Sequence, residues 1–86
     1  MVKVKLLIRR DCPNCEYVLN NLKSFPEELL QLLEIVDVEK SNIKVDATPA
    51  VVTSDGSVDY ITGNVYGLIK LFSYLIIESK KEKVVE

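Results

Sequence analysis

A pair of cysteines separated by two residues constrains this chain more than any other feature. Cys12 and Cys15 are its only cysteines, and its 86 residues include no histidine. The pair lies where an alternating apolar run, residues 2–8, gives way to a helical pattern. Pro13 suits the first turn of a helix, because its missing N–H would be unsatisfied there and its fixed φ is already helical. The pattern therefore predicts a helix that begins at the cysteine pair.

This position would activate one of the two thiols. With Cys12 at the N-cap, free backbone N–H groups and the positive end of the helix dipole favour its thiolate. We expect the pKa of Cys12 to lie below the roughly 8.5 of a free cysteine, which makes it the nucleophile. Cys15, one turn later, should be better shielded and should resolve a mixed disulfide by closing the short ring. Arg9 and Arg10 add positive charge beside the pair, and Asp11 opposes them.

Two other interpretations of the cysteine pair stay open. A zinc site needs four ligands, so here it would require carboxylates or a dimer that shares two pairs. A purely structural disulfide is the second, although so short a ring removes little entropy from the unfolded chain. Redox chemistry is the interpretation that we favour, with no metal and no cofactor beyond the Cys12–Cys15 disulfide.

Composition narrows the class of protein. A hydrophobic content of 48% over 86 residues predicts one domain that spans residues 1–86, with a frayed tail at about 81–86. A net charge of -2 does not predict the basic face typical of nucleic-acid binding. No run approaches the roughly 18 apolar residues of a membrane span, and residues 2–8 do not resemble a secretory signal. We expect neither nucleic acid nor membrane as a partner, and a cytoplasmic location, where a lone C-x-x-C is more often catalytic than structural.

Hydrophobic periodicity predicts an α/β chain that starts with a right-handed strand–helix–strand unit, so that its first two strands are parallel. A capping box at Ser24 should start a second, short helical piece. Asp55 and Gly56 predict a tight turn, and therefore an antiparallel hairpin. The expected strands are 2–8, 34–38, 50–53 and 58–62, and the expected helices are 13–23, 27–33 and 65–80, with a loop at 40–48.

The last helix is expected to begin after Gly63 and Asn64, which break the preceding strand and cap the helix. Its core-facing side is expected to comprise Val65, Leu68, Ile69, Phe72 and Ile76. Leu71, Tyr74 and Ile77 lie off that side, which permits a dimer. We favour a monomer, with these residues on an ordinary, partly exposed helix.

This order of elements, with C-x-x-C after the first strand and Thr48-Pro49 entering the third, resembles the thioredoxin superfamily and its glutaredoxin-like branch. The run from Cys12 to Cys15 is similar to the C-P-Y-C motif of glutaredoxins, with Asn14 in place of tyrosine. Gly63 and Asn64 stand where glutaredoxins have a glycine pair. The resemblance covers most of the chain in layout and depends on these short motifs.

The resemblance implies a thioredoxin-like α/β fold: a four-stranded mixed sheet in the order 2-1-3-4 with helices on both faces. It also implies a cis Pro49 beside Cys12, with the Thr48 backbone pairing to an incoming substrate. The residues alone leave a trans Pro49 at an ordinary strand start equally open. Arg10, Pro13 and Asn14 would support the start of the helix.

The implied activity is dithiol–disulfide exchange on disulfide-containing proteins or small thiols, with a reductase or glutathione as electron donor. The chain lacks the tryptophan that precedes the cysteines in thioredoxins, and Leu6 stands at the position of their buried aspartate. Asp37 could approach from the second strand, although an outward carboxylate is the favoured interpretation. The segment before Thr48 is shorter than in most glutaredoxins, where it forms part of the glutathione surface. A redox-sensing interaction module and a metal-carrying protein are the alternative functions.

Overall fold

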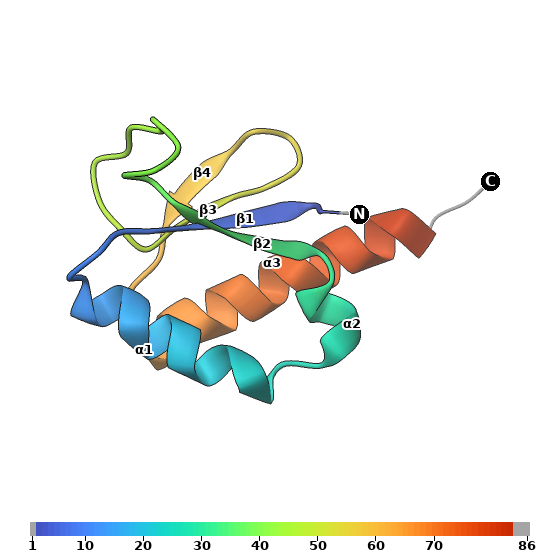
Figure 1. The fold of residues 1–86 in the computed structure, drawn as a ribbon. Coiled ribbons are helices and arrows are strands. Elements are labelled where there is room, and N and C mark those ends of the chain that lie inside the picture. The colour runs from blue at the N-terminus through green and yellow to red at the C-terminus, as the bar shows by residue number, and fades with distance from the viewer. Residues whose placement is uncertain (1, 84–86) are drawn as a thin grey trace.

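The computed structural model describes residues 2–83 and has an α/β architecture, in which a four-stranded mixed sheet packs against three α-helices (Figure 1). The order of elements is the expected one. In sequence the elements are β1 (Val4–Ile8), α1 (Pro13–Asn21), the 3₁₀ helix η1 (Leu22–Ser24), α2 (Glu27–Leu30), β2 (Leu33–Asp37), β3 (Ala50–Val52), β4 (Val58–Tyr60) and α3 (Val65–Lys83).

The strands lie in the order β2-β1-β3-β4, which confirms the prediction. β1 is parallel to β2 and antiparallel to β3, and β3 is antiparallel to β4. The turn that joins β3 to β4 contains Gly56 at φ +89°, a conformation that glycine adopts without steric cost. The strand–helix–strand unit and the hairpin are both present as expected.

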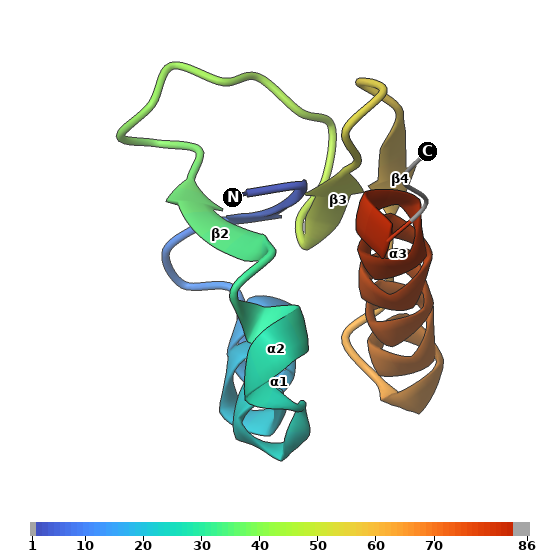
Figure 2. The same cartoon turned by 90° about the vertical axis from the view of Figure 1, so that its right-hand side faces the viewer.

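All of the helices cover one face of the sheet, so the fold has two layers (Figure 2). Helices on both faces were expected, and that expectation is wrong, because residues 38–49 between β2 and β3 form no helix. This segment instead covers part of the second face through Val45. The sheet residues buried toward the helices are Val4, Leu6 and Val51, and those buried on the second face are Leu7 and Ala50.

Several element boundaries differ from the predicted ones. α1 ends at Asn21 rather than at residue 23, because the last turn tightens into η1. The capping box at Ser24 is wrong: Ser24 belongs to η1, and Pro26 is the N-cap of α2, with no side-chain cap bond. α2 is a single turn, and β2 already begins at Leu33. β3 and β4 end one and two residues earlier than expected.

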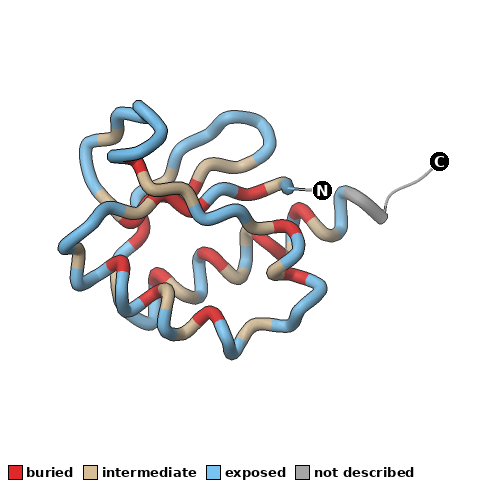
Figure 3. The backbone as a smooth tube through the Cα atoms, in the orientation of Figure 1, coloured by how far each residue is buried: buried red, intermediate tan, exposed pale blue. Residues whose placement is uncertain are grey.

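The predicted core-facing side of α3 is correct only in part. Leu68, Phe72 and Ile76 pack against the core as expected. Leu71 and Leu75 are fully buried, whereas Val65 and Ile69 are 57% and 55% exposed (Figure 3). α3 carries apolar residues on every side, so periodicity alone could not select the side that faces the sheet. The helix continues to Lys83, three residues beyond the expected end, and the rest of the expected frayed tail, 84–86, lies outside the described residues.

Polar contacts with the β3–β4 hairpin fix the rotation of α3. The Ser54 hydroxyl donates to both carboxylate oxygens of the buried Glu78, at 2.9 Å each. The Tyr74 hydroxyl donates to Asp59 Oδ2 at 2.5 Å, and Lys70 Nζ lies 3.1 Å from the same oxygen. The buried carboxylate of Glu78 requires such a partner, and the partly buried pair of Tyr74 and Asp59 adds a second contact. These pairs specify an orientation that hydrophobicity leaves ambiguous.

The pair of Tyr74 and Asp59 should make the stability of the protein depend on pH. The hydrogen bond from Tyr74 is the main cause that lowers the pKa of Asp59, and the same bond raises the pKa of Tyr74. The contribution of Asp59 is complete above the carboxyl's usual pKa of 3.8 and is lost as pH falls through the lowered value. The contribution of Tyr74 is complete below its usual pKa of 10.0 and is lost as pH rises through the raised value.

We therefore expect Tyr74→Phe to lower the free energy of unfolding by about 1 kcal/mol near neutral pH, since the bond is only partly buried. The difference between the two proteins should shrink in strong acid and in strong base. Urea unfolding of both proteins across the pH range measures it. A difference that does not vary with pH would contradict the proposed cause.

Candidate functional site

The site is built at the junction of β1 and α1 (Figure 1). Cys12 is the N-cap of α1, with extended backbone angles of φ -119° and ψ 98°, and Pro13 occupies the first helical position. Both predictions are confirmed. Asp11 has φ 57°, in the left-handed region that aspartate tolerates better than most residues. This conformation turns the chain sharply between the strand and the helix.

The two cysteines form a disulfide, with their Cα atoms 5.2 Å apart. The backbone N–H of Cys15 donates to Cys12 Sγ at 3.1 Å, in agreement with the expected N-cap position of Cys12. Cys15 is 1% exposed, whereas Cys12 is partly exposed. The expected difference in shielding is thus confirmed, because Cys12 is the more exposed residue of the pair.

Thr48, which precedes β3, lies close to the sulfur of Cys12. The Thr48-Pro49 peptide bond is cis, as the resemblance implied, and Pro49 is buried. The Thr48 hydroxyl lies 3.5 Å from Cys12 Sγ, and its carbonyl oxygen lies 3.9 Å from that atom. Sequence reasoning assigned Thr48 a backbone role alone, so the hydroxyl contact was missed. A hydroxyl beside the proline of this loop is the clue that could have suggested it.

The loop before α3 closes the site against α1. A Cβ atom added to Gly63 would lie 2.3 Å from Asn14 Cβ and 2.5 Å from Asn14 Cα, so glycine is required for this approach. The next residue, Asn64, caps α3 as predicted, since its Oδ1 accepts the N–H groups of Tyr66 and Gly67 at 3.0 and 3.2 Å. The start of α3 is therefore held directly beside the first turn of α1.

The charged residues around the cysteines are on the surface. Arg9, Arg10 and Asp11 are all exposed. Arg10 Nε lies 3.8 Å from a carboxylate oxygen of Glu39, but exposed pairs of this kind contribute little to stability. The carboxylate of Asp37 accepts the N–H of Glu39 at 2.9 Å, so Asp37 stabilises the turn that follows β2. Leu6, in place of a buried aspartate, is fully buried.

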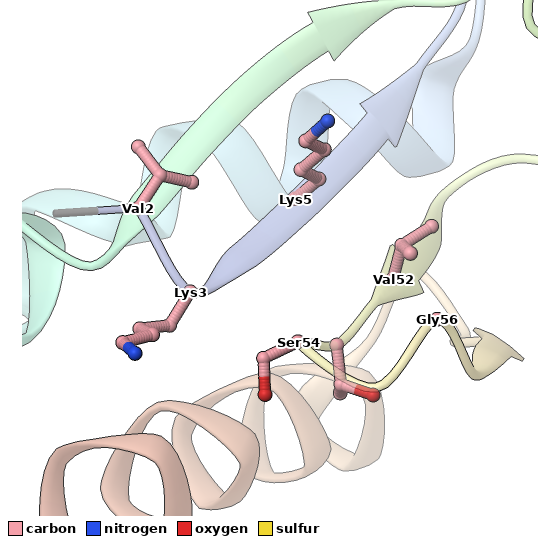
Figure 4. Close-up of a pocket in the computed structure, with 7 residues that line it drawn as sticks. Val2, Lys3, Lys5, Val52, Ser54 and Gly56 are labelled. Carbon is pink, nitrogen blue, oxygen red and sulfur yellow. The ribbon is translucent and has the colours of Figure 1, made fainter. Parts of the chain in front are cut away.

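No metal-binding group is found in the part of the chain that the structure describes, where no three histidine, cysteine or acidic residues cluster. A groove of about 340 Å³ opens on the sheet face that carries no helix (Figure 4). It lies near the start of β1, whereas the cysteines follow the end of β1, so the groove is separate from the cysteine site. Its lining residues are Val2, Lys3, Lys5, Val52, Thr53, Ser54 and Gly56.

Comparisons with known proteins identify no relative of this chain. No family model, no curated protein and no solved structure matches this chain. None of the helices described here is long and apolar enough to cross a membrane. A functional proposal therefore depends on the geometry of the cysteine site.

The Thr48 hydroxyl gives a first test of this geometry. In the reduced protein it can donate to the Cys12 thiolate, and one such hydrogen bond contributes about 1 kcal/mol. Thr48→Val, which keeps the shape and removes the donor, should therefore slow alkylation of Cys12 by iodoacetamide at neutral pH by about fivefold. Thr48→Ser is the matched control and should stay close to the wild-type rate. Equal rates for valine and serine would contradict a role for the hydroxyl.

Proposed function

We propose that this protein is a small thiol–disulfide oxidoreductase of the thioredoxin superfamily, closest in type to glutaredoxins. One observation carries the proposal: a partly exposed Cys12 caps a helix, Thr48 contacts its sulfur, and the resolving Cys15 is buried behind it. An exposed sulfur that accepts hydrogen bonds is suited to attack, and a shielded neighbour one turn away is suited to resolution.

The reduced protein starts the reaction. The Cys12 thiolate attacks one sulfur of a substrate disulfide, so that a mixed disulfide forms and the other substrate sulfur leaves as a thiolate. Cys15 then loses its proton and attacks Cys12 Sγ, which expels the second substrate thiolate. The substrate has gained two electrons and two protons, and the protein holds the Cys12–Cys15 disulfide.

An electron donor must then reduce the protein disulfide. Disulfide-containing proteins or small thiols are the proposed substrates, and a reductase or glutathione is the proposed donor. A reducing compartment such as the cytoplasm would supply either donor and would keep the cysteines in use for catalysis rather than as a permanent crosslink. No further cofactor enters this scheme.

Turnover is the test of the proposal. At one hundredth of the substrate concentration, the protein should accelerate the reduction of insulin by dithiothreitol over many cycles. A variant with both cysteines replaced by alanine gives the uncatalysed rate. If the cysteine pair can be oxidised and reduced but the protein does not accelerate insulin reduction, the protein would be a redox sensor. The enzyme proposal would then fail.

A further inference from the structure

The residue directly before the cysteine pair has an unfavourable backbone conformation. Asp11 has φ 57°, in the left-handed region that glycine adopts freely and that asparagine tolerates as aspartate does. The Asp11 side chain is exposed, and it has no hydrogen-bond or ion-pair partner within residues 2–83. Neither the turn nor a contact in this part of the chain therefore requires a carboxylate. Negative charge is the property that asparagine or glycine would lack at this position.

The start of α1 has few N–H groups that stabilise an anion. Pro13 has no N–H, and the N–H of Glu16 donates to the carbonyl oxygen of Cys12 at 3.0 Å. The N–H of Cys15 donates to Cys12 Sγ at 3.1 Å, and in the first turn only the N–H of Asn14 remains. The thiolate of reduced Cys12 depends on this helix end for its stabilisation, so a second negative charge nearby opposes it.

Asp11 supplies this second charge. Consecutive Cα atoms are about 3.8 Å apart, so the Asp11 carboxylate stays within about 10 Å of the Cys12 sulfur, about one Debye length in 0.1 M salt. We propose that Asp11 sets the redox equilibrium of the cysteine pair: its carboxylate repels the Cys12 thiolate and thereby favours the disulfide over the dithiol. In the oxidised protein no thiolate is present, and a carboxylate beside the start of α1 is favourable.

The proposal gives a preferred direction to the exchange chemistry proposed above, on which it rests. When the reduced protein reduces a substrate disulfide, two electrons and two protons pass to the substrate, and the Cys12–Cys15 disulfide forms. Proteins whose reduced form is stabilised are strong oxidants. Repulsion between Asp11 and the Cys12 thiolate has the opposite effect, so it favours this protein as a reductant of its substrates.

The other charges near the cysteines do not cancel Asp11. Arg10 Nε lies 3.8 Å from a carboxylate oxygen of Glu39, so these two charges offset each other. Arg9 and Glu16 are both exposed and have opposite charges, which leaves Asp11 unbalanced. Residues 61–69, which lead into α3, include no charged side chain. The charged residues on the segment that leads from β2 to Thr48 include two of each sign besides Glu39: Asp37, Lys40, Lys44 and Asp46.

A redox titration tests the proposal. Equilibration at pH 8 and low salt with reduced and oxidised glutathione, or with dithiothreitol for a more reducing pair, gives the equilibrium constant for disulfide formation. Asp11→Asn keeps the shape and removes the charge, so it should lower this constant about threefold, as expected for unit charges about 7 Å apart in water. Glu34→Gln, which removes an exposed carboxylate on β2, is the matched control and should leave the constant unchanged. Equal constants for the wild type and Asp11→Asn would overturn the proposal.

Two further measurements separate charge from backbone conformation. Asp11→Gly also removes the charge, so its constant should match that of Asp11→Asn. In 1 M salt, where the Debye length is about 3 Å, the difference from the wild type should fall below about 1.5-fold. A change confined to Asp11→Gly, or one that persists fully in 1 M salt, would indicate a conformational cause and overturn the proposal. These equilibria do not require catalysis, so a failure of insulin turnover would contradict the proposed function and leave this test valid.

Discussion

Replacing Cys12 with serine should reduce disulfide exchange to the uncatalysed background, because a serine hydroxyl cannot form a mixed disulfide. Replacing Cys15 should have a different effect: the first attack remains, but resolution and turnover stop. These two roles are part of the proposed function, which is supported by the partial exposure of Cys12 and the burial of Cys15.

The two variants are distinguished by trapping. Cys15→Ala is preferred to Cys15→Ser, because a hydroxyl at this fully shielded position could add an unsatisfied polar group. Non-reducing electrophoresis of Cys15→Ala with excess oxidised substrate should show a stable covalent adduct, and Cys12→Ala should show none. Adducts that form at the same rate in both variants would contradict the assignment of the nucleophile, and an adduct in Cys12→Ala alone would reverse it.

The cysteine site could be predicted from the sequence where short-range rules decide it. The N-cap position of Cys12, the place of Pro13 and the capping by Asn64 depend on residues within four positions of one another. The sheet order and the cis bond before Pro49 came from the resemblance in layout, since single residues left the cis and trans forms equally open.

Contacts between distant segments could not be predicted in this way. The Thr48 hydroxyl reaches Cys12 across 36 positions of sequence, and Gly63 packs against Asn14, which lies far from it in the sequence. The rotation of α3 is a second example: Ser54 and Asp59, both on the hairpin, hold a helix that is apolar on every side. Hydrophobic periodicity indicates that a helix has an apolar side. Which side is buried depends on the residues of other elements that contact the helix.

Replacing Gly63 with alanine should lower both stability and activity. The added Cβ would overlap Asn14 Cβ and Asn14 Cα, at 2.3 and 2.5 Å, and the second of these is a backbone atom that a rotamer change cannot move. The loop before α3 must then separate from the first turn of α1. We expect a loss of about 2–3 kcal/mol in the free energy of unfolding, as for other overpacked sites.

Alanine variants of the other two glycines are compared with Gly63→Ala, and the first of them is Gly67→Ala. Its added Cβ would lie 1.7 Å from the Thr62 carbonyl oxygen, so α3 must shift, and the expected loss of stability is at least about 3 kcal/mol. Gly56→Ala is the mild control, because no atom lies within 4 Å and the cost is limited to about 1–2 kcal/mol for its positive φ.

Exchange activity per folded molecule then distinguishes the three variants, with the folded fraction measured by urea unfolding at the assay temperature. Of the three glycines, only Gly63 contacts Asn14, which lies between the two cysteines. Gly63→Ala should therefore displace the start of α1, where Cys12 is the N-cap. Small misplacements of reacting groups have large kinetic effects, and we expect a loss of about tenfold or more for Gly63→Ala. Folded Gly56→Ala should retain nearly full activity, whereas Gly67→Ala displaces Thr62, the neighbour of Gly63, and should lose part of its activity. If all three variants had equal activity per folded molecule, the contact between Gly63 and Asn14 would have no role in the placement of Cys12.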